Sequence, residues 1–439
     1  MKIKTFVKKA RPLKIALFAQ SLFLILSCGV NTNSGTEQSK GPEETYQKMI
    51  KTFSARQANW FYKQDWEDKT LRTFRNTFIS PVSALSLFSL LHEAGNENIK
   101  NIMENIIWGE EEPFDYHEEL LNTISSLLIN NENESEGANC YSNFLNAVFM
   151  DSSKCDNLNE QFVTNVTDYF LADVFKVKFD VTDLYKVLAS YLEVATGGKM
   201  GGDRYYESVR TAEGGYLSGD IQFFSTYLLS SPWITEAESI GKGEFHNCND
   251  TVSEVDYFAF GLRNPISAGV CIKDGCYLIS IPMREGFSFN LVWPSDADEP
   301  QIAIEENLEY LINADFLPFQ NVNVEIRLPC ISFDASNGFD DFFFRQLGGG
   351  SVSMETLSGV GENFHFPPRT SNRLWGSIGE FGVTLGSLVL SAGEPNAVPC
   401  AALAHYSKPE ISINIDKPFG FVISSKDGIP VTSGIIRKF

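Results

Sequence analysis

The chain has 439 residues, with 35 Lys and Arg against 56 Asp and Glu, so its formal net charge at pH 7 is −21. Hydrophobic residues make up 43% of the sequence, a globular composition that excludes a disordered, collagen-like or coiled-coil chain. The acidic balance argues against nucleic acid as a partner and against adhesion to anionic lipid by charge alone, because both need clustered Lys and Arg.

The N-terminal segment has the pattern of an export signal. Residues 1–27 contain six basic residues and no acidic one, and subtracting them takes the net charge from −21 to −27 for the rest of the chain. The apolar run from Ile15 to Leu26 is too short to span the roughly 30 Å of a bilayer core as a helix. A basic start, a short apolar stretch and a small residue are typical of a secretory signal peptide.

The residues around Cys28 favour lipid attachment. Ile25-Leu26-Ser27-Cys28-Gly29 resembles a bacterial lipobox, in which a small residue precedes a cysteine that becomes lipidated. Ordinary signal cleavage nearby, with Cys28 incidental, is the alternative. Residues 28–44 are predicted to form a polar tether, followed by one folded domain at 45–439. These features predict an exported protein of the bacterial cell envelope or surface, held to the membrane through a lipid anchor, and otherwise an extracellular protein.

Helices dominate the first part of the folded domain, and strands the second. Apolar spacing predicts helices over 45–65, 82–108 with a break at Gly95, 158–170 and 183–195, and strands at 143–150 and 174–179. From residue 220 onward, short runs bounded by Gly, Pro, Asn and Asp predict mostly strands, including 221–229, 269–283, 287–293, 322–333, 411–415 and 419–423. Helices first and strands later, without regular βαβ alternation, predict an α+β fold with large antiparallel sheets.

The sequence lacks the common motifs of catalysis and cofactor binding. It contains no GxxxxGK[ST] phosphate loop and no GxSxG nucleophile elbow. His92-Glu93 begins like a zinc-binding helix, but Asn96 stands where the second histidine is needed, and His246-Asn247-Cys248 has no second half. We therefore expect no enzyme activity, no cofactor and no metal site.

The cysteines leave the disulfide pattern open. Of eight cysteines, seven remain if Cys28 is lipidated, so at least one thiol is unpaired within the chain. Cys271 and Cys276, on either side of Asp274-Gly275, could form a local disulfide across a turn.

A series of motifs resembles one known family. Asn76-Thr77-Phe78-Ile79-Ser80-Pro81-Val82-Ser83 precedes an apolar helix, and Ser80 and Pro81 suit a helix start as a capping hydroxyl and a residue without an amide hydrogen. Further motifs follow in order: Asn146-Ala147-Val148-Phe149, Ala172-Asp173-Val174, Thr196-Gly197-Gly198-Lys199-Met200, Trp233, Ile281-Pro282-Met283, 324–333, Leu357-Ser358-Gly359-Val360, 418–423 and Gly434-Ile435-Ile436. In this order they resemble the serpins, the serine protease inhibitor family, over residues 45–439. The resemblance implies an α+β serpin-like fold with three β-sheets, eight or nine helices and an exposed reactive-centre loop.

The resemblance also implies a mechanism. In inhibitory serpins a serine or cysteine protease cuts the exposed loop, which then inserts into the main sheet as a new strand; such an inhibitor is expected to be a monomer. Counting back from Pro418-Phe419 at the family spacing places the hinge at Ser391, Ala392, Gly393 and Glu394, in a reactive loop of about 391–410. An alternative alignment from Phe381 places it at Val389–Ala392. Under either alignment the family's E-x-G-T signature is missing.

The cleavage site is predicted in a window near the loop tip. Its residues are Ala402, Leu403, Ala404, His405, Tyr406 and Ser407. Leu403 or Tyr406 before the cleaved bond would suit chymotrypsin-like enzymes, and Ala402 or Ala404 elastase-like ones.

Two functions stay open. Glu394, Pro395 and Pro399 oppose insertion, because proline lacks a ladder donor and an unpaired buried carboxylate costs several kcal/mol. The chain is therefore expected to be a suicide-substrate inhibitor or, alternatively, a serpin-fold surface lipoprotein that binds a partner without inhibiting a protease.

Overall fold

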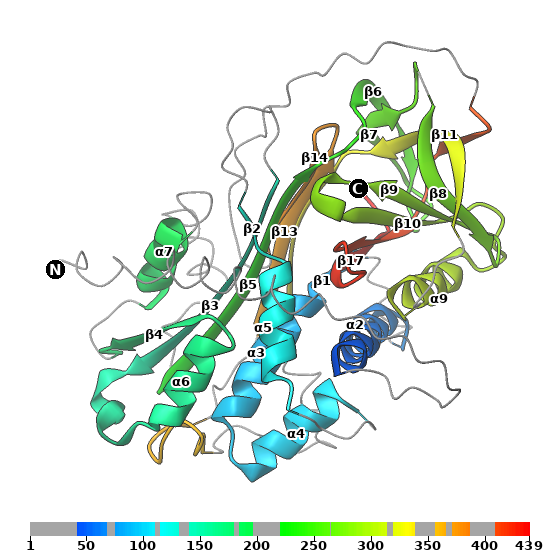
Figure 1. Cartoon of the computed structure of the whole chain (residues 1–439). Helices are drawn as coiled ribbons and strands as arrows, with labels where there is room; N and C mark the ends of the chain where they lie inside the picture. Colours follow the sequence, from blue (N-terminus) through cyan, green and yellow to red (C-terminus); the bar gives the residue numbers. More distant parts are fainter. Residues whose placement is uncertain are drawn as a thin grey trace, which may run out of the picture. The chain divides into compact units, whose positions relative to one another are not determined.

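The computed structural model describes residues 42–67, 75–109, 115–130, 140–179, 184–195, 220–263, 265–313, 319–338, 356–365, 371–386 and 409–439. They belong to one unit that runs from Pro42 to Phe439, and Figure 1 shows its chain path. None of the helices in these ranges is long and apolar enough to cross a membrane.

The first part of the unit forms the helices that the apolar spacing predicts, together with one helix at 117–126 that was not predicted. They are α2 (Pro42–Glu67), α3 (Pro81–Ala94), α4 (Glu97–Ile107), α5 (His117–Ser126), α6 (Glu160–Asp168) and α7 (Leu184–Ala195). Pro81 opens α3 as predicted, but the capping role of Ser80 is wrong. The Ser80 hydroxyl makes no cap bond and instead donates to the Val431 carbonyl oxygen at 3.1 Å. Gly95 separates α3 from α4 with an extended backbone. A larger residue would not fit there, because its Cβ would lie 2.6 Å from Ile99 Cγ2.

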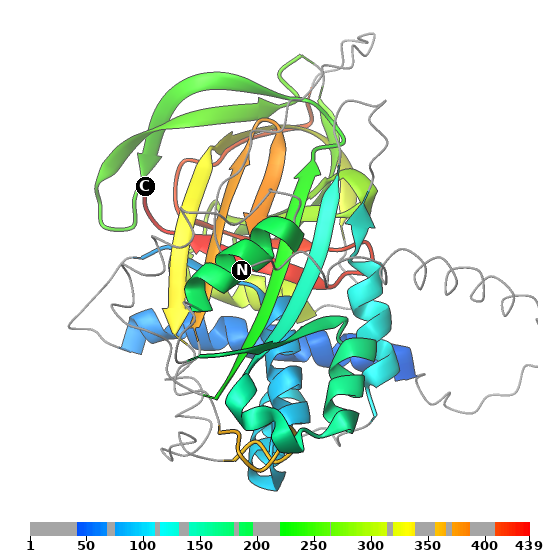
Figure 2. The same cartoon turned by 90° about the vertical axis from the view of Figure 1, so that its left-hand side faces the viewer.

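One sheet has seven strands in the order β12-β13-β14-β5-β3-β2, with β4 beside β3. The strands are β2 (Ile129–Asn130), β3 (Tyr141–Asp151), β4 (Ala172–Val177), β5 (Ile221–Pro232), β12 (Ile331–Gly338), β13 (Ser371–Gly379) and β14 (Gly382–Gly386). Only β4 runs parallel to its described neighbour. Figure 2 shows these strands side by side, with α7 crossing in front of them.

The other sheet has ten strands in the order β1-β17-β16-β10-β9-β8-β11-β7-β6, with β15 beside β11. The strands are β1 (Thr77–Ile79), β6 (Ala237–His246), β7 (Val252–Phe260), β8 (Ile266–Lys273), β9 (Cys276–Pro282), β10 (Ser288–Pro294), β11 (Gln320–Pro329), β15 (Ile411–Asn414), β16 (Phe419–Ser424) and β17 (Pro430–Ile436). β11 joins two sections, since residues 320–324 pair with β8 and residues 326–329 pair with β7. Two of the three sheets that the resemblance implies are therefore continuous through β11.

The seven-stranded sheet is covered on both faces. Alternate residues of β3 enter two separate apolar clusters: Val148 belongs to the main core, whereas Ala147 and Phe149 pack with Leu188 and Leu192 of α7. Because successive side chains of a strand point to opposite faces, α7 lies on the face opposite the main core. α3 packs against β5 and β17 on the core side.

The predicted α+β fold with large antiparallel sheets is confirmed, with three local differences from the sequence prediction. Residues predicted as part of a strand-rich region form the helix α9 (Pro300–Asn313), whose apolar residues recur at helical spacing. The run 269–283 folds as two strands joined at Asp274-Gly275. The run 322–333 changes from one sheet to the other at Cys330, whose backbone N–H donates to the Asp256 carbonyl oxygen at 2.7 Å.

Candidate functional site

β14 lies in the middle of the seven-stranded sheet, between β13 and β5. It pairs antiparallel with Trp375–Gly379 of β13 on one side and with Leu228–Pro232 of β5 on the other. A strand with ladders on both sides leaves few backbone groups unpaired. β14 is therefore an interior strand of this sheet, although it ends at Gly386, shortly before the predicted reactive loop of about 391–410.

A glycine makes the turn into β14 possible. Glu380-Phe381 connect β13 to β14, and Gly379 and Gly382 face each other across the turn. Gly382 has φ of 138°, and a Cβ there would lie 2.4 Å from the Ser231 carbonyl oxygen. Only glycine adopts this conformation without strain and fits this space.

Trp233 fixes the turn to the ten-stranded sheet. Its Nε1 donates to the Gly379 carbonyl oxygen at 2.8 Å. Its ring is buried, with centroids 5.2 Å from Phe260 and 5.7 Å from Phe289, both edge-on. The end of β13 is thereby held in place where β14 begins.

The side chains of β14 fit an interior position. Val383 and Leu385 are 1% and 4% exposed, and Thr384 between them is partly exposed. Gly376 of β13 makes room for this strand, because a Cβ there would lie 2.6 Å from the Thr384 carbonyl oxygen and 2.8 Å from Leu385 Cδ2. Burying a valine or leucine side chain contributes about 2 kcal/mol each, so β14 is held by its packing as well as by its ladders.

The first strand after the predicted loop, β15, belongs to the ten-stranded sheet. β15 pairs parallel with Val324–Arg327 of β11. Just before β15, the Glu410 N–H donates to the Asn323 carbonyl oxygen at 2.8 Å, and Asn323 Nδ2 donates to Glu410 Oε1 at 3.0 Å. Residues 387–408 therefore connect a strand of one sheet to a strand of the other.

The site residues named from the sequence lie outside the described residues. These are Cys28, the hinge residues Ser391–Glu394, the alternative hinge Val389–Ala392 and the cleavage window Ala402–Ser407. They stay predictions.

The sequence reasoning missed the turn at Glu380-Phe381-Gly382-Val383. These residues keep the glutamate and the glycine of the family's E-x-G-T signature, with valine in place of threonine. The alternation of small and apolar residues from Gly382 to Gly386 was the available signal.

Three thiols of the described residues, those of Cys140, Cys276 and Cys330, are poor nucleophiles. Burial, with Asp256 and Glu380 adding to it, raises the pKa of Cys330 to about 11. Burial likewise raises the pKa of Cys140 and of Cys276 to about 11. These thiols stay protonated near neutral pH, whereas a nucleophilic cysteine needs its thiolate.

The local disulfide considered for Cys271 and Cys276 does not form, because both are free. They are not opposed in the β8–β9 hairpin: Cys271 faces Leu278, and Cys276 faces Lys273. Within the described ranges, no three His, Cys, Asp or Glu residues are grouped so that they could hold a metal ion.

A family model described as "Serpin (serine protease inhibitor)" matches residues 61–348, about two thirds of the chain. The chain belongs to the serpin family. The matched range ends before β13, so it includes neither β14, the loop nor β15. No sequence among the curated proteins matches this serpin significantly.

Solved serpin structures show the same fold. Serpin48 of the insect Tenebrio molitor is 16% identical, with 92% of this chain and 100% of that one covered and a TM-score of 0.67. Native protease nexin-1 with heparin is 14% identical over 91% and 100% of the two chains, with a TM-score of 0.68. Thyroxine-binding globulin with thyroxine is 16% identical over 90% and 99%, with a TM-score of 0.64. At these identities the likeness shows the fold alone.

Proposed function

We propose that this serpin inhibits a serine or cysteine protease as a suicide substrate, with the segment between β14 and β15 as bait. The protease nucleophile attacks the carbonyl carbon of a loop peptide bond, the C–N bond breaks, and the new amino terminus leaves. An acyl bond then joins the protease to the residue before the cut, and the freed loop extends β14 down the sheet. The position of β14 carries this proposal, because the strand that cleavage would lengthen is already started between β13 and β5.

Along β5, the sheet leaves a length of strand to which an extension of β14 could pair. In the described part of the chain, β14 covers only Leu228–Pro232 of β5, and no strand pairs with Ile221–Tyr227 on the same side. Gly382 faces Pro232 and Gly386 faces Leu228, so the same register would bring Gly393 opposite Ile221. Full extension would therefore use residues 382–393.

The composition of that segment suits insertion. Residues 382–393 (GVTLGSLVLSAG) contain no proline and no charged residue, so each can donate to a ladder. In the register of β14, Leu388 and Leu390 would lie on the face opposite Val383 and Leu385. That face carries the apolar cluster of α7. Glu394 and Pro395 would lie beyond the end of β5. They would not have to enter the sheet, so they would not oppose insertion.

The test combines a complex assay with a melting measurement. The purified protein is mixed with chymotrypsin-, elastase- and papain-like proteases, and an SDS-stable complex is expected with at least one of them. Cutting the loop, by a protease that forms no complex, should raise the melting temperature by tens of degrees. Cleaved product with no complex for every protease, together with an unchanged melting temperature, would sink the proposal.

A second candidate is a serpin-fold protein that binds a partner without inhibiting a protease. It is favoured by the structural likeness to thyroxine-binding globulin, whose structure holds thyroxine, and by Pro399 within the loop. In this case loop cleavage should leave the melting temperature almost unchanged. The same melting experiment therefore separates the two candidates. We propose no enzyme activity for either one.

We further propose that the protein is exported and anchored through a lipid on Cys28, as a monomer. The basic segment 1–27 and the lipobox-like residues support this proposal. A Cys28→Ser variant should move from the membrane fraction to the soluble fraction of the envelope or medium. If the wild-type protein takes up no labelled fatty acid, the anchor is ruled out.

A further inference from the structure

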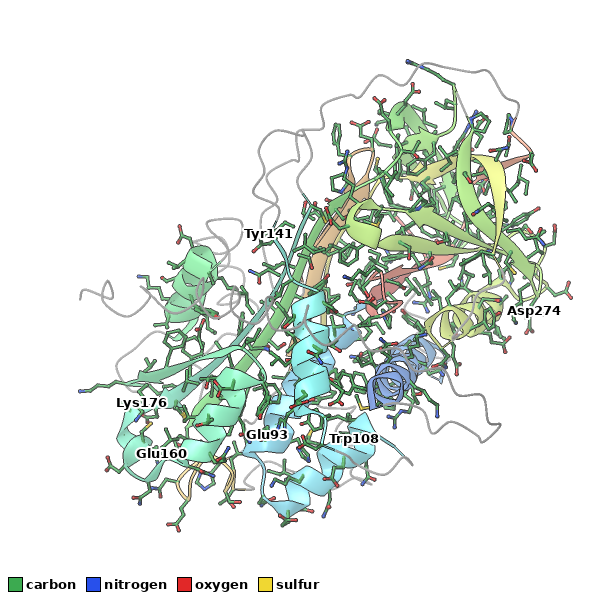
Figure 3. All side chains as sticks on the ribbon, in the orientation of Figure 1. Glu93, Trp108, Tyr141, Glu160, Lys176 and Asp274 are labelled. Carbon is green, nitrogen blue, oxygen red and sulfur yellow. The ribbon has the colours of Figure 1, made fainter. Side chains whose placement is uncertain are left out.

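A cluster of two histidines and three carboxylates joins the helices at the end of α3. Glu93, in the last turn of α3, lies with its Oε1 2.8 Å from His117 Nε2 at the start of α5. The other ring nitrogen, His117 Nδ1, lies 2.9 Å from Asp115 Oδ1. Asn165 of α6 donates from Nδ2 to Glu93 Oε2 at 3.0 Å. Glu93 is labelled in Figure 3, among the helices below the sheet.

The geometry around His117 favours a doubly protonated ring. An ionised carboxylate only accepts hydrogen bonds, so a nitrogen that faces one must carry a hydrogen. His117 faces a carboxylate with each nitrogen, and only the imidazolium donates at both positions. The side chains of His117 and Glu93 are 22% and 11% exposed, so water screens their attraction less than it would at the surface. The cation also offsets the negative end of the α3 dipole next to Glu93.

His92, one residue before Glu93, provides the contrast. Its Nε2 lies 3.1 Å from Glu104 Oε1 of α4, and its Nδ1 lies 3.5 Å from the Tyr116 hydroxyl and 4.0 Å from Glu93 Oε1. A neutral imidazole can donate to Glu104 and accept from the tyrosine. A single proton on the ring therefore satisfies the two hydrogen bonds of His92, whereas those of His117 need two.

Aromatic rings complete the surroundings of His117, and one hydrogen bond nearby leads to the sheet. The ring stacks on Tyr116 at 5.3 Å and lies 4.7 Å from the ring of Tyr169, at the end of α6. The next carbonyl oxygen, that of Phe170, accepts from Asn146 Nδ2 of β3 at 2.8 Å. The cluster is thereby connected to the central part of the seven-stranded sheet.

We propose that His117 is a proton-dependent clasp: with the added proton it ties α5 to α3 through a charge-assisted hydrogen bond to Glu93, and without that proton only a weaker, neutral hydrogen bond remains. The protein would then be more rigid at mildly acidic pH than at alkaline pH. The clasp does not depend on the proposed inhibitory function.

The pKa directions agree with the geometry. The hydrogen bond to Glu93 raises the pKa of His117 above its ordinary 6.5, against the opposing effect of burial. Burial alone would raise the pKa of Glu93, but its hydrogen bonds with His117 and Asn165 hold it below the ordinary 4.5. The stabilisation from His117 is complete below pH 6.5 and is lost as the pH rises through the raised pKa. That from Glu93 is complete above pH 4.5 and is lost as the pH falls through the lowered pKa.

The test has two independent readouts on the purified protein. NMR titration of the five histidines should show one ring, assigned by its loss in the His117→Gln variant, with a pKa above 6.5. Urea unfolding of the wild type should show stability that falls as the pH is raised from mildly acidic to mildly alkaline. His117→Gln should flatten that fall. His246→Gln, which removes an exposed histidine of β6, should leave it unchanged.

Two results would overturn the clasp. One is a His117 ring that titrates at or below 6.5 in the wild type. The other is a His117→Gln variant that keeps the full pH dependence. If that variant does not fold, the Asp115→Asn variant replaces it, because Asp115 has an 84% exposed side chain and its loss should lower the His117 pKa without opening the core.

Discussion

The two strands that flank the predicted reactive loop are held in different ways. β14, at its start, pairs antiparallel on both sides and buries Val383 and Leu385, and a glycine fits its turn. β15, at its end, pairs in parallel with β11 alone among the described strands. Parallel pairing is slightly less stable per residue than antiparallel pairing. β14 is therefore firmly held within its sheet, whereas β15 is the weaker of the two attachments.

This difference bears on how the loop could work. If β14 is the start of the inserted strand, its side chains must tolerate burial both before and after cleavage. β15 needs only to hold the far end of the loop until the protease arrives. Changes in β14 should therefore act on complex formation, and changes around β15 on the persistence of the uncut form.

The largest effect is expected from a charge on the buried face of β14. Leu385→Asp would bury an unpaired carboxylate, which costs several kcal/mol, so β14 should leave the sheet. The protease should then cut the loop without forming an SDS-stable complex. Gel analysis of the stoichiometry of inhibition measures this.

Thr384→Asp is the matched control for this change. It places the same charge one residue earlier, on the partly exposed face of β14, and it should retain most of the complex. Equal loss of complex in both variants would contradict the assigned orientation of β14.

A smaller effect is expected from filling the space that Gly376 leaves for β14. A Cβ at Gly376 would lie 2.6 Å from the Thr384 carbonyl oxygen, so Gly376→Ala should cost about 1–3 kcal/mol, as overpacking does. Gly379→Ala lies in the same strand, but its Cβ would meet nothing within 4 Å. That control should change the free energy of unfolding by less than about 0.5 kcal/mol. Denaturant unfolding of the two variants compares them directly, and equal stabilities would show that β14 does not fill this space in solution.

The helices and strands with a strong apolar pattern could be predicted from the sequence, because in these elements the apolar residues are the ones that become buried. The break at Gly95 was predicted from the glycine itself, and the structure shows why a larger residue would not fit there: a Cβ would lie 2.6 Å from Ile99 Cγ2. The helix α9 was missed, since its short apolar repeats lie in a region rich in strand-like runs. The split at Cys330 depends on which sheet each half of the run joins, which no local pattern records.

The site was harder to predict than the fold. The hinge was placed by counting from Pro418-Phe419, which assumes a loop of family length. The turn at Gly382 is defined instead by contacts with Ser231 and Trp233, more than 140 residues earlier in the sequence. Glu93 and His117 were likewise not linked, because they lie on different helices and meet only in the folded chain.

The smallest effect is expected at the weaker end of the loop. Glu410→Ala removes the bonds that the Glu410 carboxylate accepts from Asn323 Nδ2 and from the Asn323 N–H, but leaves the bond from the Glu410 N–H to the Asn323 carbonyl oxygen. Because the site is exposed, the loss should be about 1 kcal/mol or less. Asn414→Ala is the matched control, since its side chain bonds to Asp416 within the same segment and not across to β11. On prolonged warming, Glu410→Ala should lose protease-binding competence faster than the wild type, and Asn414→Ala should not. If Glu410→Ala loses competence at the wild-type rate, the attachment at β15 does not control the persistence of the uncut form.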